Sequence, residues 1–238
     1  MKITYLDNSG FAVQLGGDLL IFDYYNLYGR GGGSTLADGV VDEAALRAAG
    51  RVYIFASHSH GDHYSRGIYA LPAQNATYLL SDDIIDAPAH LRVRRLAPGQ
   101  SFEDGHIRVL AHPSTDLGVS FQVEIGGLTL FHAGDLNCWH WAQECPPEEE
   151  QSYRDAFAAA LEAIRPHMDR PDVAFFPVDP RMRGPYDDGA VIFAQAFQPR
   201  LLVPMHMQGH FEVARALAAK LPRQRIFFIE KRGDQLVL

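Results

Sequence analysis

Three histidines and one aspartate lie within a six-residue segment of this chain, His58-x-His60-x-Asp62-His63. Neutral imidazoles and carboxylates are ligands that suit zinc, manganese and ferrous iron. In an extended segment His58 and His60 point to the same side, because side chains alternate along the chain. Gly61 allows a bend, so Asp62 and His63 can serve a second, neighbouring position. The segment therefore predicts a site for two divalent cations rather than a solvated histidine-rich loop.

The elements around this segment predict an α/β fold. An apolar run at 52–56, directly before it, is typical of a strand buried on both faces. Further strands are expected at 3–6, 11–15, 19–23, 76–80, 107–111, 119–125, 128–131, 173–178, 201–206 and 226–229. Helices are expected at 42–49, 151–165, 190–196 and 213–221. With hairpins first and helices later, the pattern predicts one domain, residues 1–238, in which two mixed β-sheets pack face to face with helices outside.

Composition excludes several classes of partner. The chain has 238 residues, with 29 Asp and Glu against 21 Lys and Arg and a formal net charge of −8, so nucleic acid would be repelled. We expect no membrane-spanning helix and no signal peptide, because the sequence shows no long apolar run, and we expect its two cysteines, Cys138 and Cys145, to be reduced. These features predict a cytoplasmic protein that acts on a small-molecule substrate and binds neither nucleic acid nor a membrane. They do not specify whether the protein forms a homo-oligomer.

The His58–His63 motif resembles the hallmark of the metallo-β-lactamase superfamily, and the similarity extends over essentially the whole chain. The run Phe131-His132-Ala133-Gly134-Asp135 is most similar to the branch that contains L-ascorbate-6-phosphate lactonase. The resemblance implies an αββα sandwich with metals at the strand ends. It also implies that Asp135 bridges two metals, that His206 completes the second site, and that Asp23 orients an imidazole ligand.

The expected remaining ligand of the first site is His112, and Asp116 is the alternative. His112 follows a strand and precedes the Gly-Asp hairpin, as the family's ligand usually does. Asp116, four residues later in the same loop, offers an oxygen instead. His132 is expected to be a packed or supporting histidine near the site rather than a ligand.

Several residues are expected near the substrate. An arginine after the strand at 173–178 can hold an anionic group through its fork of N–H donors, and a salt bridge to a neighbouring acid is the alternative. The candidate substrate contacts are His140, Asp179, Arg181 and His210.

The chemistry predicted by these residues is hydrolysis. Two divalent cations, zinc first and manganese or iron as alternatives, lower the pKa of a shared water and polarise the bond under attack. Asp62 is the predicted catalytic residue, because it can orient that water. We expect a metal-dependent hydrolase for a small, anionic or neutral, ester or lactone. The alternatives are a phosphodiesterase of the same fold and a redox or non-catalytic metal-binding protein.

Overall fold

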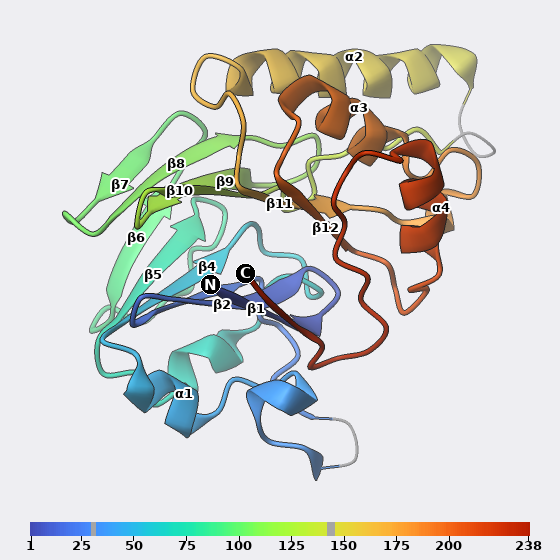
Figure 1. Ribbon diagram of the computed structural model, residues 1–238. Coiled ribbons are helices and arrows are strands. Elements are labelled where there is room, and N and C mark those ends of the chain that lie inside the picture. The colour runs from blue at the N-terminus through green and yellow to red at the C-terminus, as the bar shows by residue number, and fades with distance from the viewer. Residues whose placement is uncertain (30–31, 142–145) are drawn as a thin grey trace. The chain divides into compact units, whose positions relative to one another are not determined.

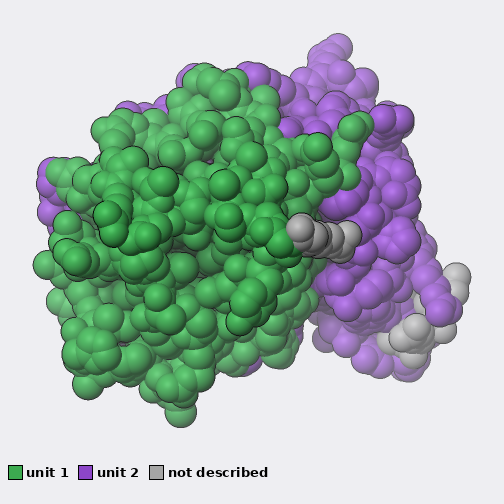
Figure 2. Space-filling model, turned by 90° about the horizontal axis from the view of Figure 1, so that it is seen from below, with its two compact units in different colours: residues 1–96, 229–238 green, residues 97–228 purple. Residues whose placement is uncertain are grey.

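The computed structural model describes residues 1–29, 32–141 and 146–238. These residues form two compact units, which Figure 2 colours separately. Unit 1 comprises Met1–Leu96 and Ile229–Leu238, and unit 2 comprises Ala97–Phe228. The single domain over residues 1–238 stays a prediction.

Unit 1 is built on a mixed seven-stranded sheet with the order β13-β1-β2-β3-β4-β5-β6. The first strands form antiparallel hairpins, whereas β3 to β6 run parallel. The strands are β1 (Lys2–Asp7), β2 (Gly10–Leu15), β3 (Asp18–Phe22), β4 (Arg51–Ala56), β5 (Ala76–Ser81), β6 (Arg92–Leu96) and β13 (Gln235–Val237). Because β3 and β4 are parallel neighbours, their carboxyl ends lie at the same edge of the sheet. That edge carries the residues discussed below.

Short helices complete unit 1: η2 (Leu36–Asp38), α1 (Glu43–Ala48) and η3 (Arg66–Ala70). Asp42 caps α1, since its carboxylate accepts a hydrogen bond from the Ala45 N–H. The helical side chains Leu46 and Ile68 join a buried cluster with apolar residues of the sheet. This apolar core fixes the strands whose ends carry the polar residues.

Unit 2 is built on a mixed six-stranded sheet with the order β12-β11-β10-β9-β8-β7. Strands β7 to β10 are antiparallel, and β10, β11 and β12 are parallel. The strands are β7 (Ser101–Glu103), β8 (Ile107–Pro113), β9 (Val119–Ile125), β10 (Leu128–His132), β11 (Val173–Pro177) and β12 (Leu201–Met205). The carboxyl ends of the last three again share one edge.

The helices of unit 2 are α2 (Pro147–Ile164), η4 (Pro180–Met182), α3 (Asp188–Phe197) and α4 (Val213–Lys220). Figure 1 shows α2 and α3 along the sheet of this unit. Phe193 of α3 stacks on Phe131 of β10 and Phe176 of β11, with ring centroids 5.1 and 4.6 Å apart, so aromatic packing joins helix to sheet. Among the described residues, no helix combines the length and apolar character needed to cross a bilayer.

The predicted α/β class with two mixed sheets and accompanying helices is confirmed. The strand predicted at 226–229 is wrong. That apolar run makes an isolated bridge from Ile226 to Leu202, and the chain instead forms β13 with β1. Apolar content alone did not reveal that the backbone of this run is mostly unpaired with a neighbouring strand.

Candidate metal centre

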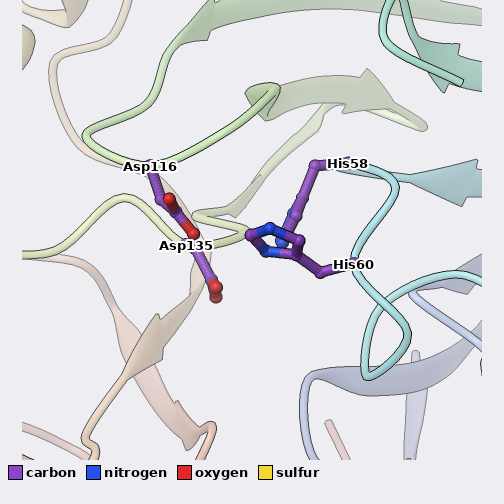
Figure 3. Close-up of side chains that lie close together, drawn as sticks. All are labelled: His58, His60, Asp116 and Asp135. Atoms are coloured by element: carbon purple, nitrogen blue, oxygen red, sulfur yellow. The ribbon is translucent and has the colours of Figure 1, made fainter.

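In unit 1 the loop after β4 carries the histidine motif. β4 is buried along most of its length, and the chain turns directly after it, because the His63 N–H donates to the His60 carbonyl. Figure 3 shows His58 and His60 leaving this loop. The ring of His58 lies 4.7 Å from that of His60 and 4.1 Å from that of His63. One short loop thus gathers three imidazoles.

Asp23 orients two of these imidazoles, His63 directly and His58 through Ser57. Its Oδ2 lies 2.7 Å from Nδ1 of His63 and accepts from the Ser57 hydroxyl at 2.7 Å. The Ser57 oxygen in turn lies 3.0 Å from Nδ1 of His58. Since the Ser57 proton goes to Asp23, the His58 Nδ1–H donates to the serine oxygen. Both rings therefore carry their proton on Nδ1 and keep the Nε2 lone pair for a cation, as in carboxylate–histidine–metal arrangements.

The backbone of Asp23 is itself unusual. It follows β3 with a φ of 44°, in the left-handed region that non-glycine residues rarely adopt. Its N–H donates to the Phe55 carbonyl of β4 at 3.0 Å, and its carboxylate also accepts from the Ser57 N–H at 2.8 Å. The buried carboxylate thus binds the ends of both strands together. The orienting contact predicted for Asp23 is present.

Asp62 differs from its neighbours because 41% of its side chain is exposed. Its Oδ2 accepts a hydrogen bond of 3.2 Å from the Asn8 side-chain amide and lies 4.0 Å from Nε2 of His63. A carboxylate that is partly exposed and adjoins an imidazole Nε2 can both ligate a cation and receive a proton.

In unit 2 the turn after β10 presents Asp135. Gly134, with a φ of 54°, makes this turn, and its N–H donates to Nδ1 of His132 at 3.2 Å. The Asp135 side chain is 7% exposed, and one of its oxygens lies 3.5 Å from Nε2 of His206. His132 thus holds the turn through its ring nitrogen, and its supporting role at a metal site stays a prediction.

Asp116 lies in the loop between β8 and β9, and hydrogen bonds tie this loop to the one that follows Asp135. The Thr115 hydroxyl donates to the Asn137 carbonyl at 2.5 Å and accepts from the Asn137 N–H at 2.9 Å. Figure 3 shows Asp116 and Asp135 on these two loops. Unit 2 therefore brings the two carboxylate-bearing loops side by side.

His206, at the end of β12, is oriented by Asp179 at the end of β11. Nδ1 of His206 lies 3.0 Å from Oδ2 of Asp179, which also accepts from the Arg181 guanidinium at 2.6 Å. Burial alone would raise the pKa of Asp179, but the hydrogen bonds from His206 and Arg181 outweigh it and hold the pKa below its ordinary value. The ionised carboxylate thus fixes Nδ1 of His206, and the buried Nε2 on the other side of the ring lies 3.5 Å from an Asp135 oxygen.

The structure places His112 in strand β8 and Asp116 in the loop that follows it. The ring lies in β8, buried, with Nε2 2.9 Å from the Gln122 side-chain oxygen and its centroid 5.7 Å from that of His167. Burial lowers the pKa of His112, so the ring stays neutral. With Nε2 committed to Gln122, this geometry favours the alternative, Asp116, as the loop ligand.

The other predicted contacts lie in varied surroundings. His140 is buried, with Nε2 3.4 Å from the Asp188 carboxylate, whereas His210 is exposed and lies 3.1 Å from Glu212. Asp179 and Arg181 bind each other, as the salt-bridge alternative predicts. Their contacts with substrate stay predictions. Cys138 is buried and free, and Cys145 lies outside the described residues.

Sequence reasoning missed three supporting groups. The role of Asp179 as the partner of His206 was not foreseen, nor that of Ser57 between Asp23 and His58. Asp83, which accepts from the Ser59 N–H at 2.8 Å and so holds the backbone between His58 and His60, was also missed. The available signal for Asp179 was its position just after the buried apolar run at 173–178, where a strand was expected to end.

Comparisons with known proteins were made by sequence and by structure. No protein-family model matches the chain. A curated protein of Carboxydothermus hydrogenoformans, described as a UPF0173 metal-dependent hydrolase, is 27% identical over a match that covers 59% of this chain and 64% of that protein. The chain therefore matches less than two thirds of that relative's length.

Solved structures of several other proteins resemble the whole chain. Igni18, a metallo hydrolase from the archaeon Ignicoccus hospitalis, has a TM-score of 0.67 at 16% identity and covers 99% of this chain and 97% of its own. The metallo-beta-lactamase fold protein YhfI from Bacillus subtilis has a TM-score of 0.63 at 15% identity, covering 99% and 98%. At such identities the likeness establishes the fold, which is the fold that the motif predicted.

Proposed function

Because the chain has the metallo-β-lactamase fold and carries that superfamily's His-x-His-x-Asp-His motif, we propose that it is a metal-dependent hydrolase. The observation that carries the proposal is the set of three imidazoles, His58, His63 and His206, each with Nδ1 bound to a carboxylate or serine oxygen. Such fixed tautomers present Nε2 to a cation. The sequence similarity to a protein described as a metal-dependent hydrolase supports the same function.

The proposed ligands fall into two groups. His58, His60, Asp116 and Asp135 would hold one cation, and Asp62, His63 and His206 a second. The mixture of imidazole and carboxylate donors fits zinc first, with manganese or ferrous iron as alternatives.

A pair of bound divalent cations would lower the pKa of a shared water molecule and polarise the bond under attack. The remaining steps belong to this chain's own residues. Asp62 would receive a proton, and the partial exposure of its carboxylate beside His63 supports this role. Asp23 and Asp179 keep their imidazoles from rotating, and the Trp139 ring, with its centroid 5.8 Å from that of His206, shields that histidine from water.

The substrate proposed is a small ester or lactone. The net charge of −8 disfavours nucleic acid, and similarity of the segment 131–135 to the lactonase branch favours a small molecule. An anionic group on the substrate would need a cationic contact, and Arg181, with about half of its side chain exposed, is the candidate.

A substrate panel tests the proposal. Protein stripped with a chelator is reloaded with Zn²⁺, Mn²⁺ or Fe²⁺ and assayed on 4-nitrophenyl esters, simple lactones and bis(4-nitrophenyl) phosphate. We expect metal-dependent hydrolysis of an ester or lactone that is lost in the His58→Ala/His60→Ala variant. Preference for the phosphodiester would reassign the substrate class. Absence of turnover with every metal, or equal turnover by the variant, would reject the hydrolase.

A further inference from the structure

The turn between β1 and β2 is polar but buried. Asn8 is 4% exposed and Ser9 is fully buried, although hairpin turns commonly lie at the surface. Gly10 is required here, because a Cβ would lie 2.8 Å from the Asp7 carbonyl oxygen and 3.0 Å from that of Asp23. The turn therefore lies directly against the residue that orients His63.

Asn8 points its side chain from this turn to the motif loop. Its backbone has a φ of 47°, a left-handed conformation that asparagine tolerates better than most residues. From there its side-chain amide donates to Oδ2 of Asp62 at 3.2 Å. The two residues are 54 positions apart in the sequence, so the contact is made by the fold of unit 1 and not by local chain geometry.

Asn8 is braced from its other side. Its N–H donates to Oδ1 of Asp7 at 3.1 Å, and Oδ2 of Asp7 accepts from the Asn26 side-chain amide at 2.6 Å. The Arg232 guanidinium lies 3.7 Å from the same Asp7 oxygen. The contacts with Asn26 and Arg232 hold the Asp7 carboxylate, and this carboxylate holds the backbone of Asn8. The side-chain amide of Asn8 therefore points to Asp62 in a fixed direction.

We propose that Asn8 is a positioning residue that holds the Asp62 carboxylate in the orientation needed to ligate a cation and receive a proton. The inference rests on the proposed function and extends it to a residue outside the motif. Asp62 follows Gly61 and is partly exposed, so its carboxylate would otherwise sample several rotamers. An amide donor restricts it without adding a positive charge that would compete with the cation.

Cobalt titration of the stripped protein, followed by the visible absorption of bound Co²⁺, measures this role without any substrate. Asn8→Gly removes the amide but keeps the left-handed backbone available, and Asn8→Asp keeps the size but replaces the donor by a second carboxylate. We expect about 10- to 100-fold weaker binding of one of two Co²⁺ ions, the usual effect of losing a partner that orients a ligand. Asn75→Asp, an exposed substitution in unit 1 that adds the same charge, should bind as the wild type does.

A double-mutant cycle separates positioning from a structural effect. If Asn8 acts through Asp62, then Asn8→Gly weakens Co²⁺ binding when Asp62 is present and causes no further loss of affinity in an Asp62→Ala background. Additive losses of affinity, or unchanged affinity in both Asn8 variants, would overturn the inference. The proposed function would stand in that case if the wild-type protein binds two Co²⁺ ions. Wild-type protein that binds no Co²⁺ would overturn the proposed function itself. Thermal melting of each variant checks folding, and Asn8→Asp carries the test if Asn8→Gly does not fold.

Discussion

Nδ1 of His206 lies 3.0 Å from Oδ2 of Asp179, and this contact joins the carboxyl ends of β12 and β11. Unit 1 contains the same arrangement, in which Nδ1 of His63 lies 2.7 Å from Oδ2 of Asp23. In each unit one partner has a left-handed backbone, with a φ of 58° at His206 and 44° at Asp23. Backbone conformations of this kind persist where surrounding contacts hold them, and they concentrate at functional sites.

Asp179→Ala should weaken metal binding. Without the carboxylate, the His206 ring can rotate or shift its proton to Nε2, so we expect a 10- to 100-fold loss of affinity for one cation. Isothermal titration of Zn²⁺ into stripped protein measures this affinity. Asp172→Ala is the control, because Asp172 accepts from the Thr129 N–H in the same unit without contacting a candidate ligand. Equal affinities for Asp179→Ala and the control would show that His206 needs no carboxylate.

Arg181→Ala distinguishes two roles for the guanidinium. Arg181 donates to both carboxylate oxygens of Asp179, at 3.0 and 2.6 Å. If this ion pair is its main role, the substitution lowers metal affinity several-fold and leaves KM for a neutral ester unchanged. If Arg181 binds an anionic substrate group, KM for an anionic ester rises and KM for the neutral ester does not. Steady-state kinetics on a matched pair of esters gives the answer.

The elements of the fold were largely predictable from local patterns. Helical periodicity at 151–165 identified most of α2, and the apolar runs at 52–56 and 173–178 identified β4 and β11. Glycine turns located the hairpins. The edge strand β6 was missed, because Arg92, Arg94 and Arg95 break the apolar pattern on which strand recognition depends.

The candidate site was predictable only where its residues are close in sequence. The His58–His63 segment shows its chemistry directly, whereas Asn8 and Asp62 meet 54 positions apart and Asp179 and His206 meet 27 positions apart. Such contacts depend on strand order, which a sequence pattern does not specify. The preference for Asp116 over His112 also depends on tertiary structure, since the contact of His112 with Gln122 does not follow from the sequence pattern.

Metal stoichiometry tests the preference for Asp116. We expect Asp116→Ala to lower the bound metal by about one equivalent, because its carboxylate is a proposed ligand, and His112→Gln to leave it unchanged. Elemental analysis of both variants after zinc loading measures the content. The reverse result, with zinc lost only from His112→Gln, would return His112 to the first site.

The stability of the stripped protein should depend on His112 in acid. Burial lowers the pKa of His112 below its ordinary value, so the unfolded chain binds the proton more readily than the folded one. The stabilisation by the neutral ring is complete above about pH 6.5, the unfolded value, and is lost as the pH falls toward the folded pKa.

Urea unfolding between pH 8 and pH 5 follows this loss. The free energy of unfolding of the wild type should fall more steeply with decreasing pH than that of His112→Gln, which cannot titrate at this position. His90→Gln, a substitution of an exposed histidine, should follow the wild type. Parallel curves for the wild type and His112→Gln would show that this ring does not control acid stability.

The most direct test of the account is whether His58, His60 and Asp116 hold the same cation. Zinc content after loading at a fixed free concentration is compared for the wild type, His58→Ala/His60→Ala, Asp116→Ala and the triple variant. The account predicts two equivalents in the wild type and one in each of the three variants, because all the substituted residues serve the same ion. Two equivalents in the histidine variant, or a further equivalent lost in the triple variant, would contradict it.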